Sequence, residues 1–161
     1  MINVPKTKLL FFDIETVGIE EDFKTLKKNR PELAKLFETY KGWIVKRFPE
    51  EENSTIDEIF YNKSALIPEF AKIIVASFAF YTPKGEIHTQ TFSSDEEVDV
   101  LTEIKGLLNK VSKLDFYLCG HNIKNFDIPM IGKRMLINGI KPPSLLPQYD
   151  TKPWDIKAVD T

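Results

Sequence analysis

A continuous apolar run that is too short for an amphipathic helix lies near the start of the chain. Residues 8–14, KLLFFDI, are rich in aromatic and large aliphatic side chains and have no polar face. Such a run predicts a strand that is buried on both faces of a sheet. We take it as the first strand, and the rest of the chain is interpreted around it.

Three further strands and two helices are predicted after residue 70, and the second of these helices lies in NFDIPMIGKRMLI. Residues 71–81 and 85–92 flank the turn TPKG, which is typical of a hairpin, and residues 114–120 form another short apolar strand. Ser94 is expected to begin a helix as its N-cap, with Glu97 as its capping-box partner. The apolar face of that helix is predicted to comprise Val98, Leu101, Ile104, Leu108 and Val111.

The order of these elements predicts an α/β fold with a mixed sheet. A helix between the third and fourth strands makes the fourth strand parallel to an earlier one, and we expect the strands of residues 9–13 and 115–119 to be adjacent. Residues 20–63 change in character and predict a helical insert that is interrupted near Pro31, with residues 49–58 as a loop. The length of 161 residues predicts a single domain, residues 1–161.

Composition and charge restrict the partners and the cellular compartment that can be expected for the protein. The net charge of -2 gives no general electrostatic attraction for nucleic acid, so such a partner must be argued from a site. Cys119 is the only cysteine, which excludes an internal disulfide and favours a reducing compartment. No uncharged apolar stretch is long enough to span a bilayer. We therefore expect a soluble, cytoplasmic protein with no membrane partner.

Two carboxylates lie two residues apart at the C-terminal end of the predicted first strand. Residues two apart in an extended chain point to the same side, so Asp13 and Glu15 present both carboxylates to one face. Asp127 follows the strand that ends at Gly120, at a predicted junction between strand and helix. If the two strands are neighbours, three carboxylates converge at the carboxyl edge of the sheet. Oxygen ligands of this kind suit Mg²⁺ or Mn²⁺, and phosphoryl transfer is the reaction class that follows.

The residues before Asp127 suit a nucleic acid. In GHNIKNFD, Asn122 offers an amide, Lys124 a cation and Phe126 a ring, which together could bind a phosphate and a base. The alternative is that the asparagines only cap the loop and that Phe126 only packs.

The two motifs FFDIET and GHNIKNFDIPMIGKR resemble the first two motifs of the DEDD 3′-5′ exonucleases, the DnaQ-like branch of the ribonuclease H fold. More narrowly, they resemble predicted exonucleases that are similar to the proofreading domain of family B DNA polymerases. The resemblance covers residues 7–18, more loosely 65–80, and 117–139, and the tail PWDIKAVDT resembles the next strand of the family. It implies a ribonuclease H-like mixed sheet of about five strands with flanking helices.

The resemblance also implies roles for individual residues. Asp13, Glu15 and Asp127 would be three of four acidic ligands for two Mg²⁺ or Mn²⁺ ions, in a scheme where the ions lie about 3.5–4 Å apart. Thr16 and Val17 would lie along the 3′-terminal nucleotide, and Asn122 and Phe126 would lie near the strand being cut. The expected reaction releases nucleoside 5′-monophosphates from the 3′ end of single-stranded DNA or RNA.

One part of the family pattern has no counterpart. The third motif places an Asp shortly after a Tyr or His on a final helix, and residues 1–161 end before that helix. Asp150, Asp155 and Asp160 are candidates for the fourth acid only by default, and Asp160 is expected to end a strand. We therefore expect a fold that lacks the C-terminal helices and a chain that is impaired as an enzyme.

Two other functions remain open at this point. The first is a non-catalytic module that binds nucleic acid or a protein, possesses the exonuclease fold and lacks the chemistry. The second is an endonuclease of the ribonuclease H type, which also has an Asp on its first strand. In those enzymes the second acid comes from a following helix, so the D-I-E spacing of Asp13 and Glu15 argues against the endonuclease.

Overall fold

The structure is a computed structural model, and it describes residues 4–147, 151–152 and 156–161. The chain divides into two compact units. The first comprises the residues up to Glu15 and from Ile73 onward, and the second comprises Thr16–Lys72. Strands β1 (Leu9–Gly18) and β2 (Ala71–Tyr81) begin in one unit and end in the other, so they carry the chain between the two.

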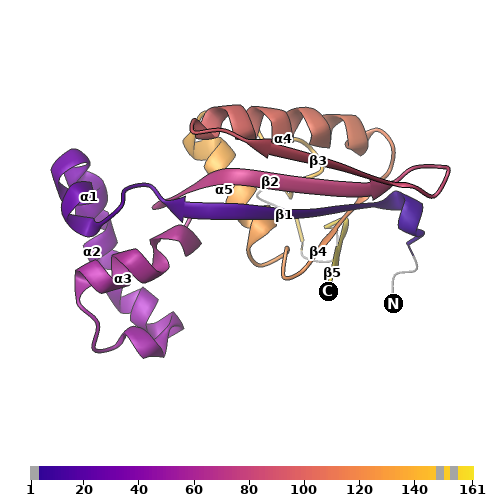
Figure 1. Cartoon of the computed structure of the whole chain (residues 1–161). Helices are drawn as coiled ribbons and strands as arrows, with labels where there is room; N and C mark the ends of the chain where they lie inside the picture. Colours follow the sequence, from indigo (N-terminus) through magenta and orange to yellow (C-terminus); the bar gives the residue numbers. More distant parts are fainter. Residues whose placement is uncertain (1–3, 148–150, 153–155) are drawn as a thin grey trace. The chain divides into compact units, whose positions relative to one another are not determined.

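The first unit is built on a five-stranded mixed sheet with the order β3-β2-β1-β4-β5 (Figure 1). Strand β4 (Tyr117–Gly120) pairs in parallel with β1, with Phe11 opposite Cys119, and β5 (Ala158–Asp160) pairs in parallel with β4. Strand β3 (Ile87–Ser93) pairs antiparallel with β2. The predicted parallel neighbours, residues 9–13 and 115–119, are therefore confirmed, and so is the mixed α/β sheet.

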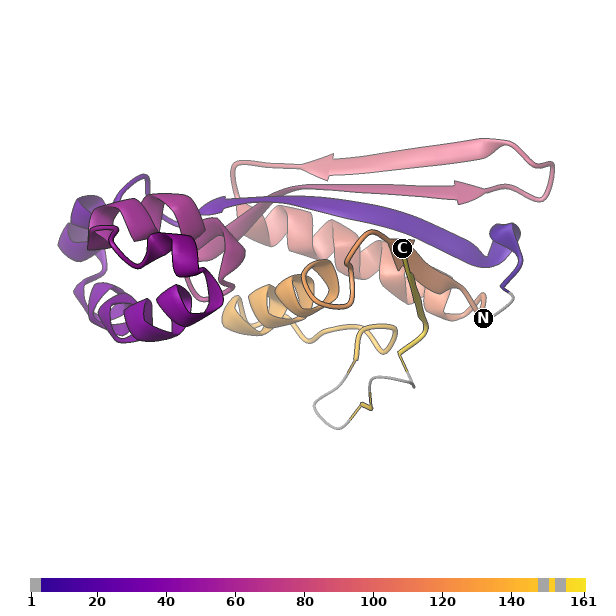
Figure 2. The ribbon, with the colours of Figure 1, turned by 90° about the horizontal axis from the view of Figure 1, so that it is seen from below.

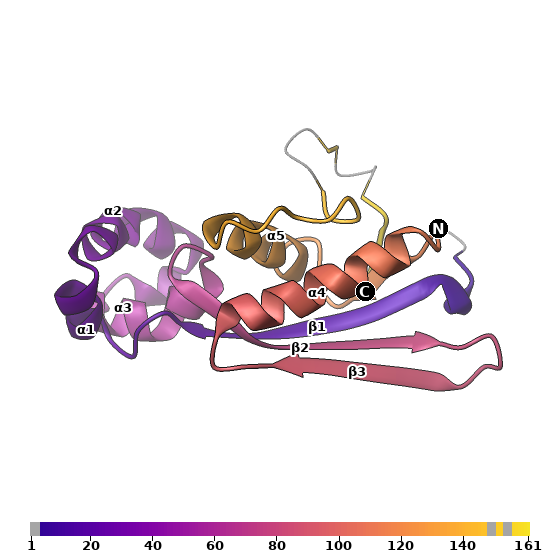
Figure 3. The ribbon, with the colours of Figure 1, turned by 90° about the horizontal axis from the view of Figure 1, so that it is seen from above.

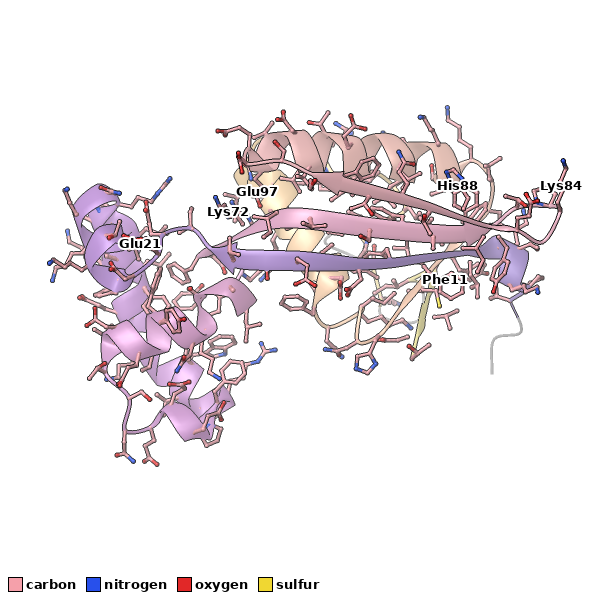
Figure 4. The ribbon with its side chains drawn as sticks, viewed as in Figure 1. Phe11, Glu21, Lys72, Lys84, His88 and Glu97 are labelled. Carbon is pink, nitrogen blue, oxygen red and sulfur yellow. The ribbon has the colours of Figure 1, made fainter. Side chains whose placement is uncertain are left out.

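The hairpin between β2 and β3 forms as the turn sequence predicts. Thr82 N donates to Glu86 O at 2.8 Å, and Gly85 N donates to Thr82 O at 2.9 Å. Gly85 has a φ of 83°, a left-handed conformation that favours glycine. Lys84 is at the tip of this turn, and His88 lies on β3 opposite Phe80, with ring centroids 5.1 Å apart (Figure 4).

Helices α4 (Glu97–Ser112) and α5 (Asp127–Ile137) contact each other and cover one face of the sheet (Figure 3). In β1, Leu10, Phe12 and Ile14 are buried, whereas Asp13 and Glu15 are exposed. The alternation places the two acids on the face opposite the helices, since successive side chains of a strand point to opposite sides. Ser77, Thr89 and Thr91 are also exposed on neighbouring strands.

The start of α4 differs from its predicted capping box. The N-cap is Glu96, and Ser94 Oγ accepts from Glu96 N instead of capping the helix. Glu97 is 9% exposed and accepts hydrogen bonds at 2.8 Å from Ile73 N and Arg134 Nε (Figure 4). The capping prediction was wrong because Glu97 is paired with a buried arginine of α5. Val98, assigned to the apolar face, is 47% exposed, and Val100 is buried instead.

The second unit is helical, as predicted for the insert. It contains α1 (Phe23–Asn29), α2 (Pro31–Arg47), α3 (Ile56–Lys63) and the short 3₁₀ turns Pro49–Glu51 and Ser64–Leu66. Another 3₁₀ turn, Lys6–Lys8, precedes β1 in the first unit. The break at Pro31 is confirmed, since Pro31 is the first residue of α2. The core of this unit comprises Phe23, Leu26, Ala34, Phe37, Ile44, Ile59, Phe60, Ile67 and Phe70.

The expected loop at residues 49–58 is partly wrong. Helix α3 begins inside it, and Thr55 forms a capping box with Glu58. Among the helices of the described ranges, none combines the length and apolar character that crossing a bilayer requires.

Candidate active site

The predicted acids of β1 lie at the carboxyl end of the parallel strand pair. Phe11 is the last residue of β1 that pairs with β4, and β1 continues to Gly18, so Asp13 and Glu15 extend past the end of β4. The loop from His121 to Phe126 then leads from β4 into α5, seen from below in Figure 2. This is the edge at which ligands gather in open α/β sheets.

Asp127 is held directly against the acidic segment of β1. Its Oδ1 accepts from the backbone N of Ile14 at 3.2 Å, and Ile14 is the residue between Asp13 and Glu15. Asp127 is the first residue of α5, and Phe126 is the N-cap of that helix. The side chain is only 3% exposed. The structure thus brings Asp127 to the D-I-E segment although 113 positions separate Asp127 and Ile14.

The environment of Asp127 disfavours its negative charge. The pKa of Asp127 is raised to about 6, mainly by burial and also by the negative charges of Asp13 and Asp160. Hydrogen bonds from its own backbone N and from Ile14 N act in the opposite direction on this pKa. A buried carboxylate with like charges nearby is stabilised by a cation, so the site has the electrostatic character of a cation site.

The carboxylates are not gathered around one point. Among the described residues, no group of three or more His, Cys, Asp or Glu side chains is close enough to hold a metal ion. Glu15 shares the exposed face of Asp13 but makes no hydrogen bond to Asp127. The donors nevertheless fit a hard divalent cation, since Asp13, Glu15 and Asp127 offer only carboxylate oxygens.

The predicted nucleic-acid residues fall into two groups. Asn122 and Phe126 lie in the loop before α5, where Asn122 Oδ1 accepts from Asn125 Nδ2 at 2.9 Å and Asn122 O accepts from Phe126 N at 3.1 Å. The asparagines therefore do cap the loop. Lys124 lies between them and is half-buried.

Thr16 and Val17 belong to the second unit. Thr16 Oγ1 donates to Ala65 O at 2.8 Å. Both residues line a hollow of about 680 Å³ within this unit, together with Ser64, Tyr61 and Lys72 among others.

Asp160 is the acid whose contacts the sequence did not predict. It ends β5, as expected, and its carboxylate accepts from Ile123 N and Lys124 N at 3.1 and 3.3 Å. The signal for it in the sequence was only the Val-Asp-Thr ending of a predicted strand. Asp150 and Asp155, the other default candidates, lie outside the described residues.

Comparison with known proteins agrees with this arrangement. The family profile of the exonuclease domain of DNA polymerase family B matches residues 1–148. The fold is similar to that of a family B DNA polymerase from the hyperthermophilic archaeon Pyrobaculum calidifontis, with a TM-score of 0.51 and 14% identity. The match covers 97% of this chain and 15% of the polymerase chain. No match is found among curated protein sequences.

The matched region includes Asp13, Glu15 and Asp127. The sheet order agrees with the ribonuclease H-like fold of the DEDD exonucleases. Because the profile covers most of the chain, the protein belongs to the family of exonuclease domains of family B DNA polymerases.

Proposed function

We propose that the chain is a metal-dependent 3′-5′ exonuclease domain that hydrolyses the last phosphodiester bond of single-stranded DNA or RNA. The observation that carries this proposal is the hydrogen bond from Ile14 N to Asp127 Oδ1. It holds the acid of the second motif against the backbone of the segment that carries the two acids of the first. Asp13, Glu15 and Asp127 are the residues that would hold Mg²⁺ or Mn²⁺, and such ions supply an activated water and stabilise the leaving oxygen.

In the proposed reaction, water attacks the phosphorus of the terminal nucleotide. The bond from phosphorus to the 3′ oxygen of the preceding nucleotide breaks, that oxygen takes up a proton, and a nucleoside 5′-monophosphate leaves. The chain's own groups would orient the substrate. Lys124 offers a cation to a phosphate, Phe126 offers a ring to a base, and Asn122 offers an amide. Thr16 and Val17 are proposed to lie along the terminal nucleotide.

Asp13, Glu15 and Asp127 account for three of the four acids of the family pattern, and no residue is assigned as the fourth. Each carboxylate contributes to the binding of divalent ions, so we propose that residues 1–161 alone have weak activity. A non-catalytic module with the same fold is the alternative, and it would bind nucleic acid without cutting it.

A nuclease assay with three substrates tests the proposal. Linear single-stranded DNA and RNA carrying a 3′-terminal label, and circular single-stranded DNA, are incubated with the chain and Mn²⁺. We expect the label to be released as 5′-monophosphate and the circle to stay intact, because it has no 3′ end. Asp13→Asn should abolish release, whereas Asp115→Asn should retain it, since Asp115 is an exposed acid that pairs with Lys157.

Three results would contradict the proposal. Cleavage of the circle would indicate an endonuclease. Equal release by Asp13→Asn would remove the first motif from the mechanism. Binding of the substrates without cleavage, with either Mg²⁺ or Mn²⁺, would favour the non-catalytic module.

A further inference from the structure

The loop that carries the second motif is tied to the last strand by a carboxylate. In the parallel pair β4–β5, Asp160 is opposite Gly120, which is the last residue of β4. Asp160 therefore lies beside the start of the loop. Its Oδ1 accepts from Ile123 N at 3.1 Å and its Oδ2 accepts from Lys124 N at 3.3 Å. Two consecutive backbone N–H groups are thereby bound by one anion, which gives charge-assisted hydrogen bonds.

A second tie lies immediately beside the first. Thr161 N and Thr161 Oγ1 both donate to Gly120 O, at 3.0 and 3.2 Å. Gly120 itself has no room for a side chain, because a Cβ there would be 2.7 Å from Phe12 O. The entry to the loop is thus fixed on both sides, by β1 and by the end of β5.

The loop transmits this position to Asp127. Asn122 has a φ of 54°, an uncommon conformation for a residue with a side chain, and its O accepts from Asn125 N and Phe126 N. Ile128 N then donates to Ile123 O at 2.9 Å. The residue whose amide is bound by Asp160 is therefore hydrogen-bonded to the first turn of α5, which begins with Asp127.

We infer that Asp160 is a positioning residue, which fixes the loop from His121 to Phe126 and, through it, the carboxylate of Asp127. This inference rests on the proposed function of the carboxylate site. It differs from the default role considered for Asp160, that of a fourth metal ligand, because both oxygens of Asp160 are engaged by the loop backbone. Replacing a residue that orients a metal ligand weakens metal binding even though it touches no metal.

Amide hydrogen exchange tests the loop contact without any need for activity. In Asp160→Ala, Ile123 N and Lys124 N should exchange about tenfold faster, the change expected when a hydrogen bond of ordinary strength is lost. Asp160→Asn, which keeps one acceptor oxygen, should show a smaller increase. The amide of Leu118, which donates to Lys157 O, reports whether the strands stay folded. Unchanged exchange at both loop amides would overturn the inference.

The matched control is Asp115→Asn. Asp115 pairs with Lys157 at 2.5 Å, so it links the same two strands at their other end, and its φ of 57° is one that Asn tolerates. This variant should leave exchange at Ile123 and Lys124 unchanged.

Metal binding separates a positioning residue from a ligand. Asp160→Ala should weaken Mn²⁺ binding about tenfold with little change in melting temperature, the lower end of the effect seen when a supporting residue is removed. Unchanged Mn²⁺ affinity in a variant with fast loop exchange would contradict positioning of Asp127. Addition of Mg²⁺ to the native chain should leave the two amides protected. If Mg²⁺ accelerates their exchange as much as Asp160→Ala does, the carboxylate has moved to the metal and Asp160 is a ligand.

Failure of the proposed function is distinguishable from failure of this inference. A chain that releases no nucleotide would refute the exonuclease proposal, whereas exchange and Mn²⁺ binding report on the loop and on Asp127 in either case.

Discussion

Replacing Asp127 by Asn should stabilise the metal-free protein at neutral pH. Asp127 is 3% exposed, and its negative charge is disfavoured by burial and by the nearby charges of Asp13 and Asp160. Asn has nearly the same shape as Asp and keeps an oxygen that can accept from Ile14 N. The hydrogen bond from Ile14 N to the native side chain can therefore be retained. The substitution therefore removes the unfavourable charge and retains the contact.

The raised pKa sets both the size and the sign of the effect. At about 1.4 kcal/mol for each tenfold change in proton affinity, a pKa raised from 3.8 to about 6 lowers the free energy of unfolding at pH 8 by about 3 kcal/mol. The folded protein binds the proton more tightly than the unfolded chain does. Stability therefore increases as the pH falls from about 6 to about 4, where both forms of the chain become protonated.

Urea unfolding in EDTA at pH 8 and pH 4 measures this effect. Asp127→Asn should be more stable than the native chain by about 2–3 kcal/mol at pH 8, and the difference should nearly vanish at pH 4. Other acids titrate in both proteins, so the difference between them isolates Asp127. A variant that is less stable at pH 8, or that gains the same stability at both pH values, would refute the electrostatic reasoning.

The remaining predictions concern packing and the buried ion pair. Glu97→Gln should cost about 3–5 kcal/mol at pH 7, the usual loss when one charge of a buried pair is removed, because Glu97 pairs with the buried Arg134. Urea unfolding measures this loss, and a value below about 1 kcal/mol would contradict the prediction. Burial alone would raise the pKa of Glu97, but the hydrogen bonds from Arg134 and from a backbone N–H lower it, so this contribution is present above about pH 4.5 and is lost below that. Gly120→Ala should cost about 1–3 kcal/mol, because its Cβ would lie 2.6 Å from Ile123 Cγ2. Gly106→Ala is the matched control and should stabilise helix α4 by up to about 1 kcal/mol, since nothing lies within 4 Å of its Cβ. Thermal unfolding measures both variants, and equal effects of the two changes would argue against the close approach at Gly120.

The features of the fold that could be predicted from the sequence depend on local patterns. The apolar run of residues 8–14 and the TPKG turn each predict one element from a few consecutive residues, and the structure confirms β1 and the hairpin. The D-I-E spacing likewise predicts the shared exposed face of Asp13 and Glu15 from the alternation of a strand.

The features that were missed depend on residues far apart in the chain. Glu97 matches a capping-box pattern with Ser94, but its partner Arg134 is 37 positions away, and a buried ion pair outweighs a surface cap. Asp160 contacts Ile123 across a similar separation. Neither contact has a signature in the spacing of neighbouring residues. Thr55 and Glu58 are different, because their capping box could have been found from the T-x-x-E pattern.

Isothermal titration calorimetry of the native chain with Mn²⁺ at pH 7.5 tests whether the carboxylates of Asp13 and Asp127 bind a divalent metal ion. We expect Mn²⁺ binding to be lost in Asp13→Asn and in Asp127→Asn and kept in Asp115→Asn. We also expect the affinity of the native chain for Mn²⁺ to fall below about pH 6, where the carboxyl of Asp127 takes up a proton. Native-like Mn²⁺ affinity in both Asp13→Asn and Asp127→Asn would contradict the claim that these carboxylates form the metal site.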